Sequence, residues 1–356
     1  MQKETDEKTI VFAEQIAAEG KYEDVVENLR KAGVLSLCTE KIRNKYGSRF
    51  TLDNFVMTDR DFELLAVLGL YDESTLEHSI RTFELAHRFI TYPFLGPSGE
   101  IIVFGDFLAG AGVSREQFLR GALFHDIGKI LIPHAILHNA LDDEEVLIKM
   151  FPEELTGQNE HEKKALLQTL YAKGIRPIDV VPLKEIFTEE KYAKLLSELE
   201  KRGFSETATL KDVIRMHEPE GRRILVSLGY ETEGELAGCH HNYGKEAHAH
   251  NMSVLGHTIG VADIIRIADI TDALRSARWY KRPLSEIDVL FILTEDAGMG
   301  KVDPLLSYVW VKDRYAELLK ENKNGLISAL GKDKEAEARA IEEFIQKKGE
   351  FRGALA

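Results

Sequence analysis

The stretch that decides the fold is Gly121-Ala122-Leu123-Phe124-His125-Asp126-Ile127-Gly128-Lys129. It places two adjacent ionisable residues in an apolar run, downstream of Ser114 and Gln117, which have the spacing of a capping box. We therefore predict a helix that starts at Ser114, runs through His125-Asp126 and ends near Gly128. Burying a histidine and an aspartate together is costly unless something compensates them. A bound metal ion compensates both at once.

Further histidines and aspartates flank this stretch at long distances. The full candidate set is His78, His125, Asp126, His217, His240, His241 and Asp269. Imidazole and carboxylate ligands suit iron or manganese, with nickel or zinc as alternatives, better than they suit calcium. One metal rarely uses so many protein ligands, whereas two metals that share a carboxylate do, and Asp126 is the natural bridge because it lies at the centre of the set.

Two choices within this set stay open. Asp263 and Asp272 compete with Asp269 for the role of the last aspartate. His240 and His241 are adjacent, so on a helix their side chains point about 100° apart. Both can reach metals only near a helix end, or where the site lies between their directions.

The length and composition of the chain limit the classes of protein to which it can belong. The chain has 356 residues, with 44% hydrophobic and 30% charged residues, which fits one large domain with appendages or two domains. No apolar run approaches the roughly 18 residues of a membrane span, and the charged start Met1–Glu7 is unlike a secretion signal. Cys38 and Cys239 fit a reducing compartment, so we expect a cytoplasmic protein. Cys239, beside His240, is read as a small packed residue, with ligation as the alternative.

The net charge of −14 argues against an extended nucleic-acid surface, which needs a basic face. A small phosphorylated ligand remains compatible with this charge, because it needs only a local cluster of cations and metals.

The periodicity of apolar residues predicts an all-α protein. An N-terminal helical region, residues 1–70, has amphipathic patterns at Thr9–Ala18, Tyr22–Ala32 and Asp59–Gly69. We interpret it as a docking or regulatory element, and as a candidate surface for a homodimer or a signalling partner. The main domain is predicted at 71–312, followed by a helical tail at 313–356.

Two insertions interrupt the main domain. Pro, Gly and a strand-like run near 92–109 indicate a loop or small hairpin. Residues near 150–213 are rich in Glu, Lys and Leu and indicate a solvated helical insertion, with a lid over the site as the alternative. Residues 240–270 are predicted to be mostly helical.

The order His … His-Asp-x-x-Lys … His … His-His … Asp resembles the HD superfamily of metal-dependent phosphohydrolases, and most closely its HD-GYP branch of cyclic di-GMP phosphodiesterases. The stretches that carry the resemblance are His78–Arg81, Ala122–Ile130, His217–Gly221, Ile267–Leu274 and Ala297–Pro304. The resemblance covers roughly residues 70–312 and implies an HD-type helical core.

The resemblance implies two metal ions and a hydroxide between them as the nucleophile. One metal would take His78, His125, Asp126 and Asp269. The other would take Asp126, His217, His240 and His241. Lys129 would hold one phosphate of a small nucleotide and act with Asp126 in catalysis, and Arg278 and Lys281 would hold the second phosphate.

Departures from the branch put the substrate in question. The Gly-Tyr-Pro element that should follow the histidine pair is absent, and Asn242–Glu246 stands in its place. A third metal would need a glutamate where this chain has Ser74, so we expect two metals. His134 and His138 have the spacing of a surface metal site but are read as a solvated or packed pair. Among His248, His250 and His257, one is a candidate to touch the substrate in place of the missing loop, although packing is the favoured reading.

Three functions are therefore carried forward. The first is a binuclear phosphodiesterase for a cyclic dinucleotide, with cyclic di-GMP as the expected substrate. The second, motivated by the missing element, is a nucleotidase or phosphomonoesterase of the wider superfamily. The third is a signalling protein that retains its metals without turnover.

Overall fold

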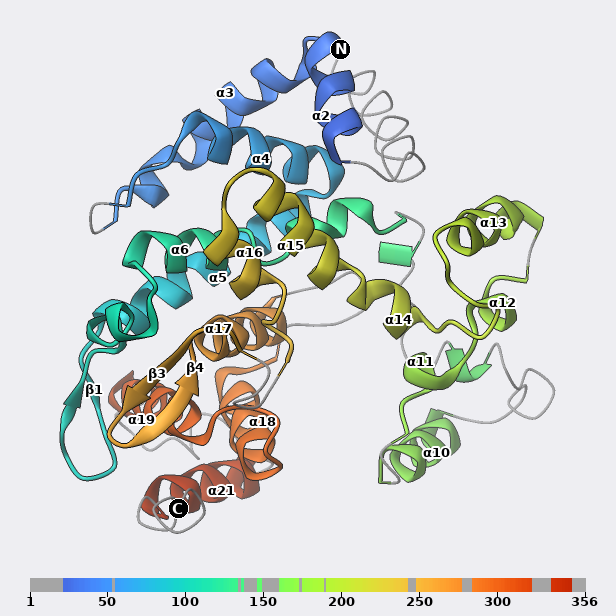
Figure 1. Ribbon diagram of the computed structural model, residues 1–356. Coiled ribbons are helices and arrows are strands. Elements are labelled where there is room, and N and C mark those ends of the chain that lie inside the picture. The colour runs from blue at the N-terminus through green and yellow to red at the C-terminus, as the bar shows by residue number, and fades with distance from the viewer. Residues whose placement is uncertain are drawn as a thin grey trace. The chain divides into compact units, whose positions relative to one another are not determined.

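The computed structural model describes residues 22–52, 55–133, 136–137, 146–148, 160–172, 175–188, 190–242, 248–276, 284–321 and 334–347 (Figure 1). The described residues are mainly helical, with two small antiparallel sheets of two strands each. The prediction of an all-α fold is confirmed. None of the described helices is long and apolar enough to cross a membrane.

The chain divides into two compact units, and each collects segments that are distant in sequence. The first unit comprises residues 1–48, 57–73 and 127–224, and the second comprises 49–56, 74–126 and 225–356. The chain passes between the units directly after Asp126. The domain boundary predicted at residue 312 falls inside a helix, Pro304–Glu321.

Helices form nearly all of the first unit (Figure 1). In chain order they are α2 (Tyr22–Lys31), α3 (Val34–Tyr46), α4 (Asp59–Tyr71), the 3-10 helix η4 (Ile127–Leu131), α10 (Glu160–Ala172), α11 (Pro177–Val180), α12 (Leu183–Ile186), the 3-10 helix η5 (Glu190–Tyr192), α13 (Ala193–Lys201), α14 (Leu210–Arg215) and α15 (His217–Ser227), which continues into the second unit. The short η1 (Gly47–Phe50) follows α3.

The N-terminal helices agree with the sequence pattern. Helix α3 packs on both α2 and α4, and α4 contacts η4. A capping box starts α4, where the Thr58 hydroxyl accepts from the Asp61 amide and the Asp61 carboxylate accepts from the Thr58 amide. The helices predicted over Tyr22–Ala32 and Asp59–Gly69 are confirmed, whereas the one predicted over Thr9–Ala18 lies outside the described residues.

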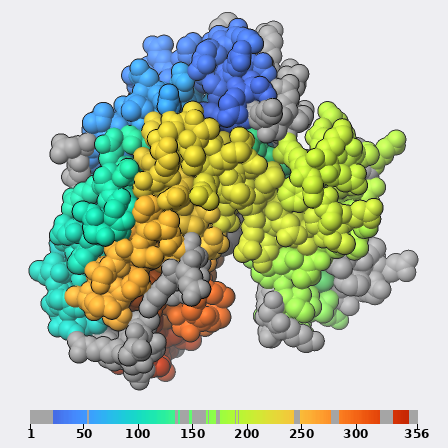
Figure 2. Space-filling view, viewed as in Figure 1, coloured from blue at the N-terminus to red at the C-terminus, as the bar shows by residue number. Residues whose placement is uncertain are grey.

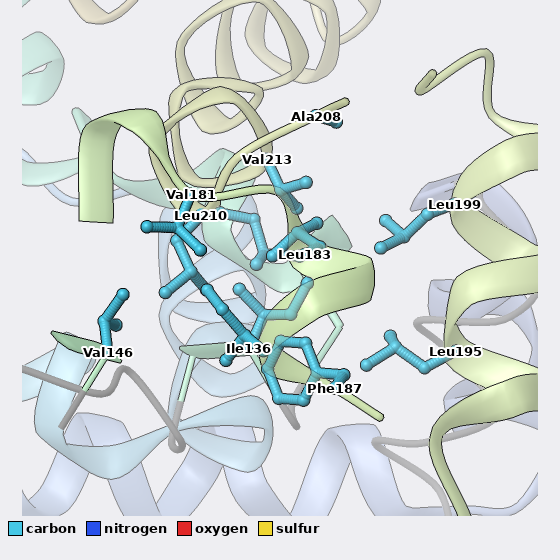
Figure 3. Packing of buried hydrophobic residues seen from close by; sticks show 12 residues of the cluster. Ile136, Val146, Val181, Leu183, Phe187, Leu195, Leu199, Ala208, Leu210 and Val213 are labelled. Atoms are coloured by element: carbon cyan, nitrogen blue, oxygen red, sulfur yellow. The ribbon is translucent and has the colours of Figure 1, made fainter. Parts of the chain in front are cut away.

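The insertion contributes most of a hydrophobic core that also includes residues from the segment just before it (Figure 3). Its buried residues are Ile132, Ile136, Val146, Val181, Leu183, Ile186, Phe187, Leu195, Leu199, Ala208, Leu210 and Val213. The space-filling view shows the described residues of α10 to α14 in green and yellow-green (Figure 2). The sequence predicts a solvated helical insertion, and the structure adds that its apolar residues are buried in a core. The core forms because Leu, Ile and Val recur among the charged residues of the insertion.

The second unit carries longer helices and both hairpins (Figure 1). Its elements are α5 (Glu73–Thr91), β1 (Phe94–Leu95), β2 (Ile101–Ile102), the 3-10 helices η2 (Phe104–Asp106) and η3 (Ala109–Ala111), α6 (Arg115–Leu123), α16 (Glu231–Ala237), β3 (Asn251–Val254), β4 (His257–Gly260), α17 (Val261–Arg275), α18 (Glu286–Gly298), α19 (Pro304–Glu321) and α21 (Glu335–Gln346). Helix α17 is central, because it contacts α16, β4, α18 and α19.

An aromatic core ties α5 to α19 within this unit. The rings of Phe89 and Trp310 stack with centroids 4.6 Å apart, and Phe94 lies 5.5 Å from Phe89. All three side chains are almost fully buried. Stacked aromatic pairs of this kind add to the free energy of burial and hold helices in a fixed register.

One hairpin was predicted and the other was not. Strands β1 and β2 pair through Leu95 and Ile101, which confirms the hairpin expected near 92–109. Residues 251–260 form the hairpin β3–β4, so the prediction of helix through this region is wrong. The turn needs positive φ at Leu255 (54°) and Gly256 (81°), a combination that matches the twist of a tight hairpin. The alternation of buried Met252 with exposed Ser253 is the signal of a strand.

Candidate metal centre

The second unit brings six of the seven predicted ligand residues, including both histidines of the adjacent pair, to the ends or faces of four helices. His78 lies on α5 and Asp269 on α17. His125-Asp126 follows α6, and His240-His241 follows α16. The described helices α6 and α16 pack against one another, and α16 contacts α17. The tertiary arrangement thus collects side chains from residues 78 to 269 in one place.

The His-Asp dipeptide lies outside the helix that precedes it. Helix α6 begins with the predicted capping box, in which the Gln117 amide donates to the Ser114 hydroxyl over 3.1 Å. It ends at Leu123, five residues before the predicted end near Gly128, and His125-Asp126 form a turn before η4. This corrects the prediction of a continuous helix. Leaving the helix frees the dipeptide from helical spacing, so that both side chains point into the same cluster.

Four donor groups converge closely. Nε2 of His78 lies 2.9 Å from Oδ1 of Asp269 and 3.5 Å from Oδ2 of Asp126. Nε2 of His125 lies 3.4 Å from Oδ2 of Asp126 and 3.9 Å from Oδ1 of Asp269. An ion bound at the usual 2.0–2.2 Å from nitrogen and oxygen separates its ligands by about 3 Å. These four residues therefore fit the predicted first metal.

His240 joins the same cluster. One donor group of His78, His125 and Asp126, and another of His125, His240 and Asp269, each have all ligand atoms within 4.8 Å of one another. The ring of His240 lies 4.9 Å from that of His125, centroid to centroid. His125 belongs to both groups, so the cluster is continuous.

The adjacent histidines can face one region because they lie beyond a helix end. Helix α16 ends at Ala237, and His240 and His241 follow in a turn, with ring centroids 4.0 Å apart. Arg266 of α17 donates to the His241 carbonyl, which fixes this turn on the central helix. The condition set by the sequence, that both side chains need a helix end, is met.

Backbone carbonyls fix the tautomer of the histidines. Nδ1 of His125 lies 2.9 Å from the Ala122 carbonyl, and Nδ1 of His240 lies 2.6 Å from the Ala237 carbonyl. A carbonyl only accepts, so Nδ1 must carry the proton and Nε2 presents its lone pair. That lone pair is what a metal requires, and the second ring nitrogen of a ligating histidine is ordinarily held in this way.

His78 is oriented by a carboxylate instead. Its Nδ1 lies 2.7 Å from Oδ2 of Asp272, and Arg81 donates to the same carboxylate from Nε (2.7 Å) and Nη2 (3.0 Å). Ser276 adds a further hydrogen bond to Asp272. A carboxylate behind a histidine raises its basicity as a ligand.

The sequence pattern does not predict these supporting roles. It presents Asp272 only as a rival of Asp269, and Arg81 only as part of a motif. The available signal was the spacing, because His78 and Arg81 on α5, and Asp269 and Asp272 on α17, are each three residues apart and share a helix face. The other rival of Asp269, Asp263, caps the start of α17 by accepting a hydrogen bond from the Gly260 amide.

The electrostatics of the cluster follow from burial and close opposite charges. Burial by itself lowers the pKa of His78, but hydrogen bonds to Asp269 and Asp272 and the charge of Asp126 outweigh it and raise that pKa. Burial, with the neighbouring charge of His125, lowers the pKa of His240 to about 4. Burial tends to raise the pKa of Asp269, but His78 and the other histidines hold it well below its usual range. The carboxylate is ionised and His240 neutral at pH 7, which are the states that bind metals.

The first unit holds two further predicted site residues. His217 begins α15 and is buried, and its Nδ1 lies 2.6 Å from the Ile214 carbonyl, the same arrangement as in His125 and His240. Lys129 lies on η4. A Cβ on Gly128 would meet the His217 carbonyl oxygen at 2.0 Å, so only glycine permits η4 to pack against the start of α15.

Some predicted residues lie elsewhere. Arg278, Lys281, His134 and His138 lie outside the described residues. The thiol of Cys239 donates to the Glu235 carbonyl over 3.0 Å, in agreement with packing.

The three later histidines have separate surroundings. His248 is buried beside Asp263, with Nε2 and Oδ1 3.3 Å apart. His250 lies between the Ala111 carbonyl and Glu235. His257 lies on β4.

Comparison with known proteins identifies one domain. Residues 75–183 match the family model of the HD domain, which supports membership of the HD superfamily. HD domains are generally metal-dependent phosphohydrolases, and the matched range contains His78, His125, Asp126 and Lys129. No curated protein and no solved structure matches the chain.

Proposed function

We propose that the chain, through the HD domain at residues 75–183, is a phosphodiesterase that uses two divalent metals to hydrolyse a cyclic dinucleotide, with cyclic di-GMP as the leading substrate. One observation carries the proposal. Buried imidazole and carboxylate donors form two overlapping groups, His78–His125–Asp126 and His125–His240–Asp269, and within each group the ligand atoms lie within 4.8 Å of one another. Burying such groups together is costly, and ligation of metal ions is the compensation that suits their chemistry.

Each ligand has a defined task in this proposal. His78, His125, Asp126 and Asp269 would hold one metal, and Asp126 would bridge to a second held by His217, His240 and His241. Two metals lower the pKa of a bound water and neutralise charge on a transferring phosphoryl group. Iron and manganese suit the nitrogen and oxygen donors, with nickel and zinc as alternatives.

The protein's own groups prepare the site for this chemistry. The carbonyls of Ala122 and Ala237 keep His125 and His240 in the Nδ1–H tautomer, and Asp272 does the same for His78 with a full negative charge. The burial of these side chains excludes water, which strengthens each electrostatic interaction. In this proposal Lys129 binds a phosphate as a point charge, and Arg278 and Lys281 bind the other.

The test is the fate of cyclic di-GMP. Protein purified without oxygen and supplied with Fe(II) or Mn(II) is incubated with the dinucleotide, and the products are separated by chromatography. We expect linear dinucleotide or GMP from the wild type and none from Asp126→Ala. Asp296→Ala is the matched control, because Asp296 lies on α18 and pairs with Lys301 over 3.2 Å outside the cluster.

A nucleotidase or phosphomonoesterase is the second candidate. It is favoured by the sequence at 242–246, which lacks the Gly-Tyr-Pro element of the cyclic di-GMP enzymes that the chain resembles. Release of inorganic phosphate from nucleoside monophosphates, with cyclic di-GMP left intact, would establish this candidate. Two bound metals with no turnover of either substrate class would point to a signalling role through the N-terminal region.

A further inference from the structure

The 3-10 helix η4, which carries Lys129, is held by two residues that are distant from it in sequence. Nη1 of Arg202 donates to the Leu131 carbonyl over 2.5 Å, and the Tyr71 hydroxyl donates to the Ile132 carbonyl. Tyr71 is the last residue of α4, and Arg202 follows α13 of the insertion. The last carbonyls of a helix lack partners within it, so these two side chains act as a cap supplied by distant segments.

Arg202 is itself rigidly placed. Its amide donates to the Glu198 and Leu199 carbonyls, and Gly203 follows with a φ of 88°, the left-handed conformation that ends a helix tightly. Leu199 packs in the core of the insertion, and so does Ile132, the residue after η4. The insertion therefore contacts η4 both through its core and through the guanidinium.

The surroundings of Arg202 are unusual for a surface arginine. The side chain is half-buried, and its Nη2 is shielded from solvent without a hydrogen-bond partner. Within the described residues, no carboxylate forms an ion pair with it. Removing a guanidinium from water to bind a neutral carbonyl has a desolvation cost. We take this cost as a sign that the position of the Leu131 carbonyl, at the end of η4, matters to the phosphate subsite.

We propose that Arg202 is a positioning residue that fixes η4 and, through it, the phosphate-binding direction of Lys129. Tyr71, at the end of α4, supports the same helix. In this proposal the insertion holds the phosphate subsite in position through Arg202. This inference rests on the proposed function, because it assigns Lys129 to a phosphate.

The experiment compares four full-length variants loaded with Mn(II). Arg202→Met removes the donors and keeps the aliphatic stem, Arg202→Lys restores one donor, and Tyr71→Phe removes one hydroxyl. Lys201→Met is the matched control, since Lys201 is the exposed neighbour at the end of α13. The first measurement is hydrogen exchange of the peptide 127–133, which is independent of any activity. The second is the affinity for inorganic phosphate by calorimetry, with metal content checked in each sample.

We expect faster exchange in Arg202→Met and a phosphate affinity about tenfold weaker, below the hundredfold that larger misplacement causes. Metal content should be unchanged, Arg202→Lys should recover part of the affinity, and Lys201→Met should equal the wild type. With a substrate that the wild type hydrolyses, KM should rise more than kcat falls. Tyr71→Phe should change exchange and affinity in the same direction as Arg202→Met.

A double-mutant cycle separates positioning from general stability. In a Lys129→Met background, Arg202→Met should weaken phosphate binding no further, because the group that it positions is gone. The inference would be overturned if the losses of phosphate affinity caused by Lys129→Met and Arg202→Met were additive. It would also be overturned if Arg202→Met bound phosphate with wild-type affinity. Failure of the wild type itself to bind phosphate would refute the phosphate role of Lys129, and with it both the proposed function and this inference. Wild-type binding with an unaffected Arg202→Met would refute the inference alone.

Discussion

Replacing Asp272 by asparagine removes the negative charge behind His78 while preserving the size of the side chain. The carboxylate accepts from His78 Nδ1 at 2.7 Å and from Arg81 at 2.7 and 3.0 Å. Burial tends to raise the pKa of Asp272, but hydrogen bonds and charge from His78 and Arg81 lower it to about 2. The group is therefore ionised at neutral pH, and its charge would support His78 as a ligand of the proposed metal.

The expected loss of metal affinity depends on which interactions of Asp272 each substitution preserves. Groups that orient ligating histidines are typically worth between about tenfold and a hundredfold in metal affinity. In Asp272→Asn an amide oxygen can still accept from His78, and only the charge is lost, which about halves the strength of the hydrogen bond. We expect metal affinity to fall about tenfold, or ~1.4 kcal/mol, in Asp272→Asn, and to approach a hundredfold loss in Asp272→Ala.

The assay is titration of metal-free protein with Mn(II) by calorimetry, supported by competition with a chelator. Asp296→Asn is the control, because Asp296 is an ion-paired aspartate of the same unit that lies outside the cluster. Thermal unfolding of each variant without metal checks that the fold is retained. Wild-type Mn(II) affinity in both Asp272 variants would refute the reasoning, and equal losses in the two would refute the separation of charge from hydrogen bonding.

Three further predictions concern stability. Gly128→Ala puts a methyl carbon 2.0 Å from a backbone carbonyl oxygen at the start of α15, so we expect a loss of at least about 2 kcal/mol in chemical denaturation, and an unchanged midpoint would count against this contact. Arg120→Met leaves Glu233, which is 4% exposed, without the guanidinium 3.4 Å away, and should lower the free energy of unfolding by about 3–5 kcal/mol, well above the loss of a surface pair. Burial tends to lower the pKa of His248, but the nearby Asp263 carboxylate and Cys239 thiol raise that pKa from 6.5 to about 9. Because the folded-state pKa is the higher one, the stabilisation is complete below pH 6.5 and is lost as the pH rises through 9, so the free energy of unfolding should fall over that range more steeply in the wild type than in His248→Gln.

The candidate site could be predicted in its chemistry but not in its supporting contacts. A buried His-Asp dipeptide needs compensation wherever it lies, so the residue types at 125 and 126 indicate a metal by themselves. Which of Asp263, Asp269 and Asp272 faces the cluster of candidate ligands depends on how α17 is rotated against α5. Two of the three face other partners, and residue type does not distinguish them.

In two places the local sequence pattern predicts a different secondary structure from the one that forms. The helical periodicity near 240–270 hid a hairpin whose turn uses a positive φ at Leu255, a residue type that rarely adopts it. The helix end at Leu123 has no glycine or proline to mark it, since the next glycine is Gly128. In both places tertiary contacts overrode the pattern that the sequence presents.

By itself the amino-acid sequence determined the helical fold class, the capping box at Ser114 and the identity of the candidate ligands, because periodicity and side-chain chemistry are local properties. Only the tertiary structure decided that His125-Asp126 leave the helix, that Asp272 and Arg81 orient His78, and that the insertion has a core and holds η4 through Arg202. Each of these depends on the distance between residues far apart in the chain, and that distance is set by packing.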